Sequence, residues 1–437
     1  MHPLFPSVKY TQTTVDPLGS FGRRASHRIL ELALRANVHI RVSDSVKSQQ
    51  PALRFMFSFP SVGSSLMKRP SLVVIFWCVM FGVLLDGPGY AQQRATITDQ
   101  PTCPSCVISL QRIGELDNTG DRLPLGRPIS VRQDSRGRIF VNTDVNKDGI
   151  LLFDSEWQAE RILGRAGRGP GEFFSIVSIN ITAGDTLVVL DRGNKRISFF
   201  DSTLEHVRDM SFWGMPHYAE SIVLPNGELV ISADMPGPDA FGIPIHRVDT
   251  GGNVTHSFGA EPGRSVAGDY YGTVRAVALA RDGTIWSARY NDYYLENWSI
   301  EGRLLRVFVG DRPWFRPYAE LPPYSFKEPP APRIRTVREV APGKILVVSQ
   351  RAKSTGWQEG MGDRPGHSGP VLGIPKRWLT FDSQLDLIDV DTGELLQTHI
   401  VPAYVMGFVN DTILHSYDET ELDVPTITLW ELSLDVH

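Results

Sequence analysis

A tight turn between two apolar runs recurs six times along the chain and restricts the folds open to it. Each copy is a three-residue turn that ends in Gly or Asp, followed by a run rich in β-branched or aromatic residues. The six turns are Ser135–Gly137, Ala183–Asp185, Pro225–Gly227, Arg281–Gly283, Ala341–Gly343 and Val409–Asp411. Alternating apolar and polar residues on both sides of such turns are typical of antiparallel strands. The chain therefore predicts six similar β-sheet units.

A second pattern adds two more strands to most units. A third strand ends at an apolar residue that is followed by Asp in three units, at Phe153, Phe200 and Val248. In a fourth unit the strand ends at Trp298. A fourth strand follows the next turn, for example over Arg303–Val309 or Glu394–Ile400. Six four-stranded antiparallel units describe an all-β, six-bladed β-propeller, in which neighbouring blades cover each other's apolar faces.

The last unit contains only three strands of its own, at Tyr404–Val409, Thr412–Ser416 and Thr426–Leu432. Cys106–Ile113 precedes the first unit and has the alternating pattern of a strand. We expect this N-terminal strand to complete the last blade. Such a closure joins the two ends of the propeller and removes two open sheet edges.

The segment before the repeats has the pattern of an export signal. Met67–Ser71 carries two basic residues, Leu72–Leu85 is apolar, and small residues occupy the −3 and −1 positions before Gln92. A bilayer span needs ~20 residues, so a cleaved signal peptide at residues 67–91 is favoured over an uncleaved anchor. The expected product is periplasmic or secreted, with no stable membrane span after cleavage, and its propeller comprises residues 92–437.

Residues 1–66 contain no repeat and offer one short helical stretch at Ser26–Ala36. They are interpreted as an upstream extension outside the native protein, or as a disordered segment if translated. The remaining body, residues 92–437, has 34 basic and 45 acidic side chains, a net charge of −11. An acidic body without a basic run argues against a nucleic-acid partner. A monomer is expected.

One stretch has a recognisable family pattern. Gly164 and Gly167–Phe173 are followed by Asp191–Ile197 and then by Phe200-Asp201. This stretch resembles an NHL-type repeat, and the chain resembles the six-bladed β-propeller proteins of bacterial envelopes. The resemblance implies fold much more than activity, because this fold hosts binding modules, lyases and hydrolases.

The cysteine count excludes a disulfide framework, because Cys78, Cys103 and Cys106 can form at most one bridge. Cys103 and Cys106 have the spacing of a redox CxxC motif, but no thioredoxin-like helix is predicted after them, and Val107 excludes haem attachment. A local disulfide between Cys103 and Cys106 that pins the N-terminal strand is favoured.

Long connections gather at one end of the predicted propeller. In a four-stranded meander, the first and third turns of each blade lie at one end, and the middle loop and the crossing to the next blade lie at the other. We call these the short-turn end and the long-loop end. The long-loop end receives Asp234–Pro244, Gly259–Gly272, Asp311–Arg333 and Lys353–Phe381. Connections of this length suggest binding loops or a partial lid.

Aromatic and arginine residues in these loops are the candidate contacts to a peptide, a glycan or a small aromatic molecule. The alternative is that the rings pin the loops to the blade ends. The candidate ligand-binding residues are Arg168, Asp191, Arg192, His217, Tyr271, Tyr290, Asp292, Trp314, Arg316 and Arg351.

No cofactor is predicted, although calcium and zinc stay open. Asp144–Gly149 matches the first half of a calcium loop but lacks the bidentate Glu, so a hairpin is favoured over weak calcium binding. A zinc site would have to be assembled from scattered histidines of several blades. Gly167–Gly171 lacks the strand–turn–helix context of a phosphate loop and is interpreted as a blade crossing.

The sequence contains no GxSxG motif and no close carboxylate pair that demands catalysis. The leading hypothesis is therefore an exported binding or scaffold module that has no catalysis of its own. The alternative is a metal-dependent hydrolase or lyase, with a site at the mouth of the central channel.

Overall fold

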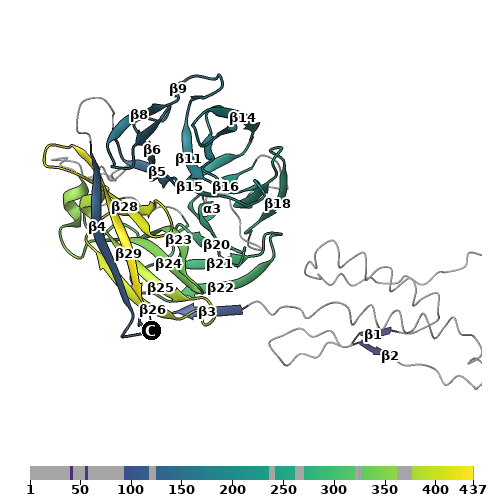
Figure 1. The fold of residues 1–437 in the computed structure, drawn as a ribbon. Coiled ribbons are helices and arrows are strands. Elements are labelled where there is room, and N and C mark those ends of the chain that lie inside the picture. The colour runs from purple at the N-terminus through teal and green to yellow at the C-terminus, as the bar shows by residue number, and fades with distance from the viewer. Residues whose placement is uncertain are drawn as a thin grey trace, which may run out of the picture. The chain divides into compact units, whose positions relative to one another are not determined.

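Each of the six predicted units forms an antiparallel blade in the computed structural model (Figure 1). The first five units supply four strands each, and the sixth supplies three and is completed by a strand from the N-terminal segment. The described residues of the propeller are 93–117, 125–235, 242–260, 270–319, 324, 326–361 and 376–436. The predicted all-β, six-bladed propeller is confirmed.

The first three blades take the chain to residue 258. Blade 1 contains β5 (Pro128–Gln133), β6 (Ile139–Thr143), β7 (Ile150–Phe153) and β8 (Ala159–Leu163). Blade 2 contains β11 (Ile176–Ile181), β12 (Leu187–Asp191), β13 (Arg196–Phe200) and β14 (His206–Ser211), preceded by the short parallel pair β9 (Arg165–Ala166) and β10 (Glu172–Phe173). Blade 3 contains β15 (Met215–Val223), β16 (Leu229–Asp234), β17 (Ile245–Val248) and β18 (Val254–Phe258).

The last three blades carry short helices in their connections. Blade 4 follows α3 (Tyr270–Thr273) and contains β19 (Arg275–Leu279), β20 (Ile285–Arg289), β21 (Tyr294–Trp298) and β22 (Leu304–Gly310). Blade 5 contains β23 (Arg333–Ala341), β24 (Lys344–Ala352), β25 (Phe381–Asp389) and β26 (Leu395–Val401), with η1 (Trp357–Met361) and α4 (Arg377–Thr380) between β24 and β25. Blade 6 contains β27 (Val405–Phe408), β28 (Ile413–Glu419) and β29 (Pro425–Asp435).

The core lies between the blades rather than in one central mass. In the described part of the chain, each of the six interfaces between neighbouring blades holds its own cluster of buried apolar side chains. The second strand of a blade is covered on both faces, so all five residues of β6 and of β12 are buried. Outer strands such as β14 face solvent, and exposed residues alternate in them with half-buried or buried ones. This burial pattern explains the continuous apolar runs that follow the six turns.

The N-terminal strand completes the last blade, as expected. β4 (Val107–Asp117) pairs antiparallel with β29, from Asp117 opposite Thr426 to Val107 opposite Asp435. Figure 1 shows the dark blue β4 beside the yellow β29. Ile108 and Leu116 of β4 are buried in the clusters on the two sides of blade 6. The strand extends beyond Ile113, the end predicted from the alternation.

A fifth strand on blade 4 was not predicted. β3 (Gln93–Ile97) pairs in parallel with β22, from Gln93 opposite Arg306 to Ile97 opposite Gly310. A parallel edge strand needs no hairpin turn, so the sequence carries no turn signal for this pairing. Its last residue, Ile97, is fully buried in the cluster between blades 4 and 5.

The predicted disulfide between Cys103 and Cys106 is present. It lies in the segment that leads from β3 to β4, and this segment is attached to blade 5. The backbone N–H groups of Thr102 and Cys103 donate to the carbonyls of Leu395 and Leu396, at 2.8 and 3.0 Å. The bridge therefore fixes the chain between blade 5 and the closing strand of blade 6.

The chain divides into two compact units, Met1–Gly89 and Tyr90–His437. In the first unit the described residues are β1 (Ile40–Val42) and β2 (Phe55–Phe57), which form an antiparallel pair. The expected helical stretch at Ser26–Ala36 and the expected signal peptide at residues 67–91 lie outside the described residues. Within the described residues, no helix has the length and apolar character needed to cross a membrane.

Candidate functional site

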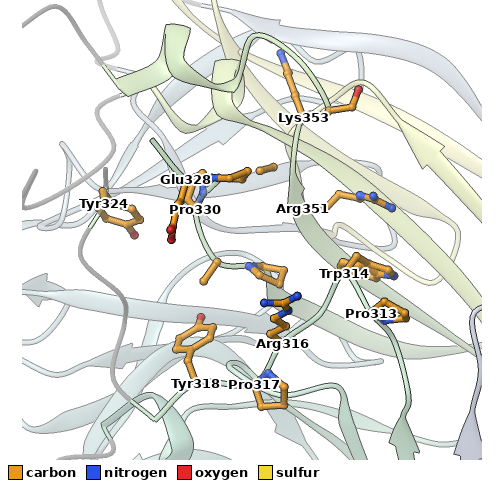
Figure 2. Close-up of a pocket in the computed structure, with 15 residues that line it drawn as sticks. Pro313, Trp314, Arg316, Pro317, Tyr318, Tyr324, Glu328, Pro330, Arg351 and Lys353 are labelled. Atoms are coloured by element: carbon orange, nitrogen blue, oxygen red, sulfur yellow. The ribbon is translucent and has the colours of Figure 1, made fainter. Parts of the chain in front are cut away.

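A groove of about 640 Å³ lies at the long-loop end, beside blades 4 and 5 (Figure 2). It is formed by the crossing from β22 to β23 and by the last residues of β24. Figure 2 shows Trp314 and Arg351 on one side, Tyr318 and Tyr324 on the other, and Arg316 between them. The lining residues are Pro313, Trp314, Arg316–Tyr318, Tyr324, Glu328–Pro332 and Arg351–Ser354.

Arg351 and Trp314 hold each other in place. The guanidinium carbon of Arg351 lies 5.0 Å from the centre of the Trp314 ring, and its Nη1 donates to Gln384 Oε1 at 2.8 Å. The guanidinium carbon of Arg312 lies 5.5 Å from the same ring. The Trp314 ring therefore orients the guanidinium groups of Arg351 and Arg312, since arginine stacks well on aromatic faces.

A buried ion pair anchors the crossing that carries these residues. Arg312 Nη1 lies 2.8 Å from Asp386 Oδ2 in β25, and Arg312 Nε lies 2.5 Å from Asp99 Oδ1. Tyr293 donates its hydroxyl to the same Asp386 oxygen at 2.8 Å. Arg312 and Asp386 are both buried. The anchor joins blade 4, blade 5 and the N-terminal segment next to Trp314.

Four tyrosines continue from the groove toward the channel. The rings of Tyr271 and Tyr290 are stacked with centroids 5.5 Å apart, and Tyr318 meets Tyr271 edge-on at 6.4 Å. Tyr290 accepts a hydrogen bond of 3.0 Å from Arg333 Nη1. Tyr324 lines the groove and is also buried in the cluster between blades 6 and 1.

The structure brings together five of the ten predicted ligand-binding residues. Trp314, Arg316 and Arg351 line the groove, and Tyr271 and Tyr290 form the adjoining stack. The other five also lie at the long-loop end, but on other parts of blades 2, 3 and 4.

Asp191 has a structural role in blade 2. It is buried, and its carboxylate accepts backbone N–H bonds from Phe174, Ser175 and Asn194. The carboxylate of Asp191 therefore ties the loop after β12 to the crossing before β11, which is a structural role. Arg168, which is exposed, and Arg192, which is half-buried, flank the same loop and do not line the groove.

His217 belongs to a buried Ser–His–Asp chain in blade 3. Its Nδ1 lies 2.9 Å from Ser232 Oγ, and its Nε2 lies 3.2 Å from Asp234 Oδ2. A nucleophilic serine must face its substrate, yet Ser232 is buried and the Asp234 side chain is 40% exposed. The order of exposure is the reverse of that in a hydrolytic triad.

Asp292 follows β20 in blade 4, where its Oδ2 lies 3.9 Å from Arg289 Nη1.

A cluster of arginines around Tyr404 was missed. Arg333 and Arg335 lie on β23, Arg377 on α4 and Arg127 before β5. Burial would raise the pKa of Tyr404, but Arg333, Arg377, Arg335 and Arg127 lower it to about 8. Most of these side chains lie on or beside innermost strands, where a polar residue in an alternating run gives no sign of a site. Arg377 is the exception, because it lies in the long connection Lys353–Phe381. The arginines of that connection were the one feature of the sequence that could have indicated this cluster.

The described residues contain no group of three or more His, Cys, Asp or Glu side chains that could hold a metal ion. The calcium-like segment at Asp144–Gly149 connects β6 to β7, where a hairpin was predicted. Asp144 Oδ2 lies 2.9 Å from Arg127 Nη2 and is therefore already neutralised by a cation.

The fold and the comparisons agree on the class of protein, a six-bladed β-propeller. A family model described as a 6-bladed beta-propeller, DUF5128, matches residues 116–212. The chain matches no curated protein.

Two solved structures share this fold at low sequence identity. One is described as a "putative exported protein" from Bacteroides fragilis NCTC 9343, with TM-score 0.51 and 9% identity, over 79% of this chain and 100% of that one. The other is a member of the DUF4221 family from Bacteroides vulgatus ATCC 8482, with TM-score 0.52 and 13% identity, over 75% of this chain and 98% of that one. A virginiamycin B lyase from Staphylococcus aureus has TM-score 0.38 and 10% identity, over 75% and 100%, which is too distant to carry an argument about activity.

Proposed function

We propose that the protein is a binding module that takes an extended, acidic segment of a peptide or glycan in the groove at its long-loop end. The observation that carries the proposal is the groove itself, whose lining contains three basic residues, Arg316, Arg351 and Lys353, and a single acidic residue, Glu328. The orientation of Arg351 by Trp314 and Gln384 lowers the entropy lost when it binds a carboxylate. Five prolines stiffen the crossing that forms one wall.

A binding role without catalysis agrees with the arrangement of the polar groups. Ser232 of blade 3 is buried, and Arg351 of the groove is stacked on Trp314 and hydrogen-bonded to Gln384 rather than placed beside a nucleophile. The alternative, a metal-dependent hydrolase or lyase, has no observation in its favour among the described residues.

We further propose that the protein is exported after cleavage behind Ala91. The first strand of the propeller begins at Gln93, so this cleavage would leave every strand of the propeller intact. The disulfide between Cys103 and Cys106 supports the same proposal, because disulfides persist in oxidising compartments. The amino-terminal sequence of the mature protein should begin at Gln92, and an uncleaved chain in the membrane fraction would contradict the proposal.

The binding proposal is tested with arrays of peptides and glycans that include acidic and neutral members. The protein should retain acidic members, and Arg316→Ala and Arg351→Ala should each weaken that retention about 10-fold or more, as expected for a lost charge-assisted contact. Arg281→Ala is the matched control, because Arg281 is an exposed arginine at the short-turn end. Retention that survives both groove variants, or that falls equally in the control, would overturn the proposal.

A further inference from the structure

A second hollow of about 290 Å³ opens at the long-loop end of the central channel, between the innermost strands of blades 1, 5 and 6. We call it the channel-mouth pocket. It is lined by Arg127–Ile129, Asp144, Lys147, Arg335, Arg377, Tyr404 and Met406. It is separate from the groove, and none of its lining residues was among the ten candidate ligand-binding residues.

The pocket holds far more positive than negative charge. Four of its lining side chains are basic, whereas Asp144 is the one carboxylate in the lining and already pairs with Arg127 at 2.9 Å. Arg333, which is 2% exposed, lies close enough to act on the phenol of Tyr404 and adds a further buried cation. Such an excess is costly in a folded protein unless a counter-charge is supplied.

Several donors of these arginines have no hydrogen-bond acceptor among the described residues. They are buried nitrogens: Nε and Nη2 of Arg333, Nε of Arg335 and Nε of Arg377. A buried donor without an acceptor costs about 1–3 kcal/mol, more when it is charged. Two of these donors, Nε of Arg335 and Nε of Arg377, belong to side chains that line the pocket, whereas Arg333 lies outside its lining.

The arginines are held in place by the fold. The register of β23 against β24 shifts between Ile334 and Thr336, which leaves Arg335 outside the regular ladder. Irregularities of this kind re-aim side chains next to functional sites. The guanidinium of Arg333 stacks over the Phe381 ring at 4.3 Å and donates to the Tyr290 hydroxyl.

We propose that the channel-mouth pocket binds an oxyanion, a carboxylate, sulfate or phosphate group, through Arg335, Arg377 and the hydroxyl of Tyr404. Planar guanidinium forks match the geometry of these anions and form their strongest hydrogen bonds in proteins. Arg333 does not line the pocket. It acts on the phenol of Tyr404 as a positioning residue and adds positive potential to the site. This inference goes beyond the proposed function, since the pocket can bind its anion whether or not the groove is occupied.

The test is isothermal titration calorimetry of the full chain with sodium sulfate, sodium phosphate and sodium glucuronate. Ionic strength is held constant with sodium chloride, so that general screening cannot produce the signal. We expect one saturable site for at least one of the three salts. The salt that binds most tightly identifies the oxyanion that the pocket prefers. No saturable binding by any of them would overturn the proposal.

Substitutions locate the site. Arg335→Gln and Arg377→Gln should each weaken binding at least 10-fold, and Arg281→Gln, at the opposite end of the propeller, should leave the dissociation constant unchanged. Equal affinity in all four proteins would place the anion elsewhere and overturn the proposal. Loss of array binding by groove variants that still bind the oxyanion would confirm that the two sites are separate.

A spectroscopic readout keeps the proposal testable even if a variant does not fold. An anion among the arginines offsets their charge, so it should raise the pKa of Tyr404 from about 8 toward its ordinary value. Ultraviolet absorbance of tyrosinate in the unmodified protein should therefore fall as the anion is added at pH 8–9. A purely structural arginine cluster that admits no anion would show no such change.

Discussion

Tyr404 is a buried phenol among arginines, and its ionisation gives the residue-scale prediction that is simplest to measure. The arginines lower its pKa from 10.0 to about 8 in the folded protein. Its ionised form therefore stabilises the fold fully above pH 10, and this contribution is lost as pH falls through about 8. The free energy of unfolding of the unmodified protein, relative to that of Tyr404→Phe, should rise between pH 8 and pH 10.

The matched control is Tyr417→Phe. Burial and a hydrogen bond to Glu419 raise the pKa of Tyr417. Its phenol stays protonated in the folded protein over the same range, so the stability difference between this variant and the unmodified protein should not rise. It should be nearly flat to about pH 9 and fall slightly near pH 10, where the phenol of the unfolded chain begins to ionise. Parallel pH profiles for the two variants would contradict the assignment. Chemical denaturation at a series of pH values measures both.

The ion pair of Arg312 and Asp386 supports a second prediction at this scale. Arg312→Ala leaves the fully buried Asp386 carboxylate without its cation, and breaking such a pair typically costs about 3–5 kcal/mol. Arg316→Ala, four residues away and exposed, should change the free energy of unfolding by less than about 0.5 kcal/mol. Urea unfolding of the two variants measures the difference. Adding Asp386→Asn to Arg312→Ala should recover part of the loss, because it removes the unpaired charge.

The side chains of the candidate sites could be predicted from the sequence to different extents. Trp314, Arg316 and Arg351 could be predicted because they lie in or next to connections that are too long for simple turns. Arg335 and Tyr404 could not, because each sits at the start of an inner strand, where alternation of polar and apolar residues is expected in any case. Their proximity depends on the closure of the ring, which brings residues far apart in the chain to one channel mouth.

At the scale of elements, the segment between β3 and β4 is the joint between blades 5 and 6. The disulfide between Cys103 and Cys106 closes a very short loop, so its entropic effect on the unfolded chain is limited to roughly 2 kcal/mol. Reduction, or the double change Cys103→Ser and Cys106→Ser, should lower the melting temperature by a few degrees only. A collapse of the whole propeller on reduction would show that the bridge does more than pin this joint.

Strands with turn signals were predictable as elements, whereas β3 was not. The six tight turns and the continuous apolar runs after them identify the first two strands of every blade. β4 was recognisable because blade 6 lacks an outer strand and an alternating segment was left over near the N-terminus. β3 adds to a blade that is already complete, and its parallel pairing with β22 depends on where residues 98–106 direct the chain.

For the whole molecule, ring closure by β4 makes the strongest prediction. Blade 6 has three strands of its own, so removing residues 103–113 exposes the edge of β29 and takes Ile108 from the cluster between blades 5 and 6. It also cuts the joint to blade 5, so that blade 6 is held in the ring only by the apolar contacts of its own strands with the two neighbouring blades. We expect the melting temperature to fall on the order of 10 °C, which corresponds to several kcal/mol in a domain of this size.

Deletion of residues 93–97 is the control, because it removes a single buried apolar side chain and leaves blade 4 with its four strands. A fall as large as that caused by loss of residues 103–113 would mean that any added edge strand stabilises the molecule equally. A much smaller fall would identify closure of the ring by β4 as the feature that makes six weakly stable sheets unfold together.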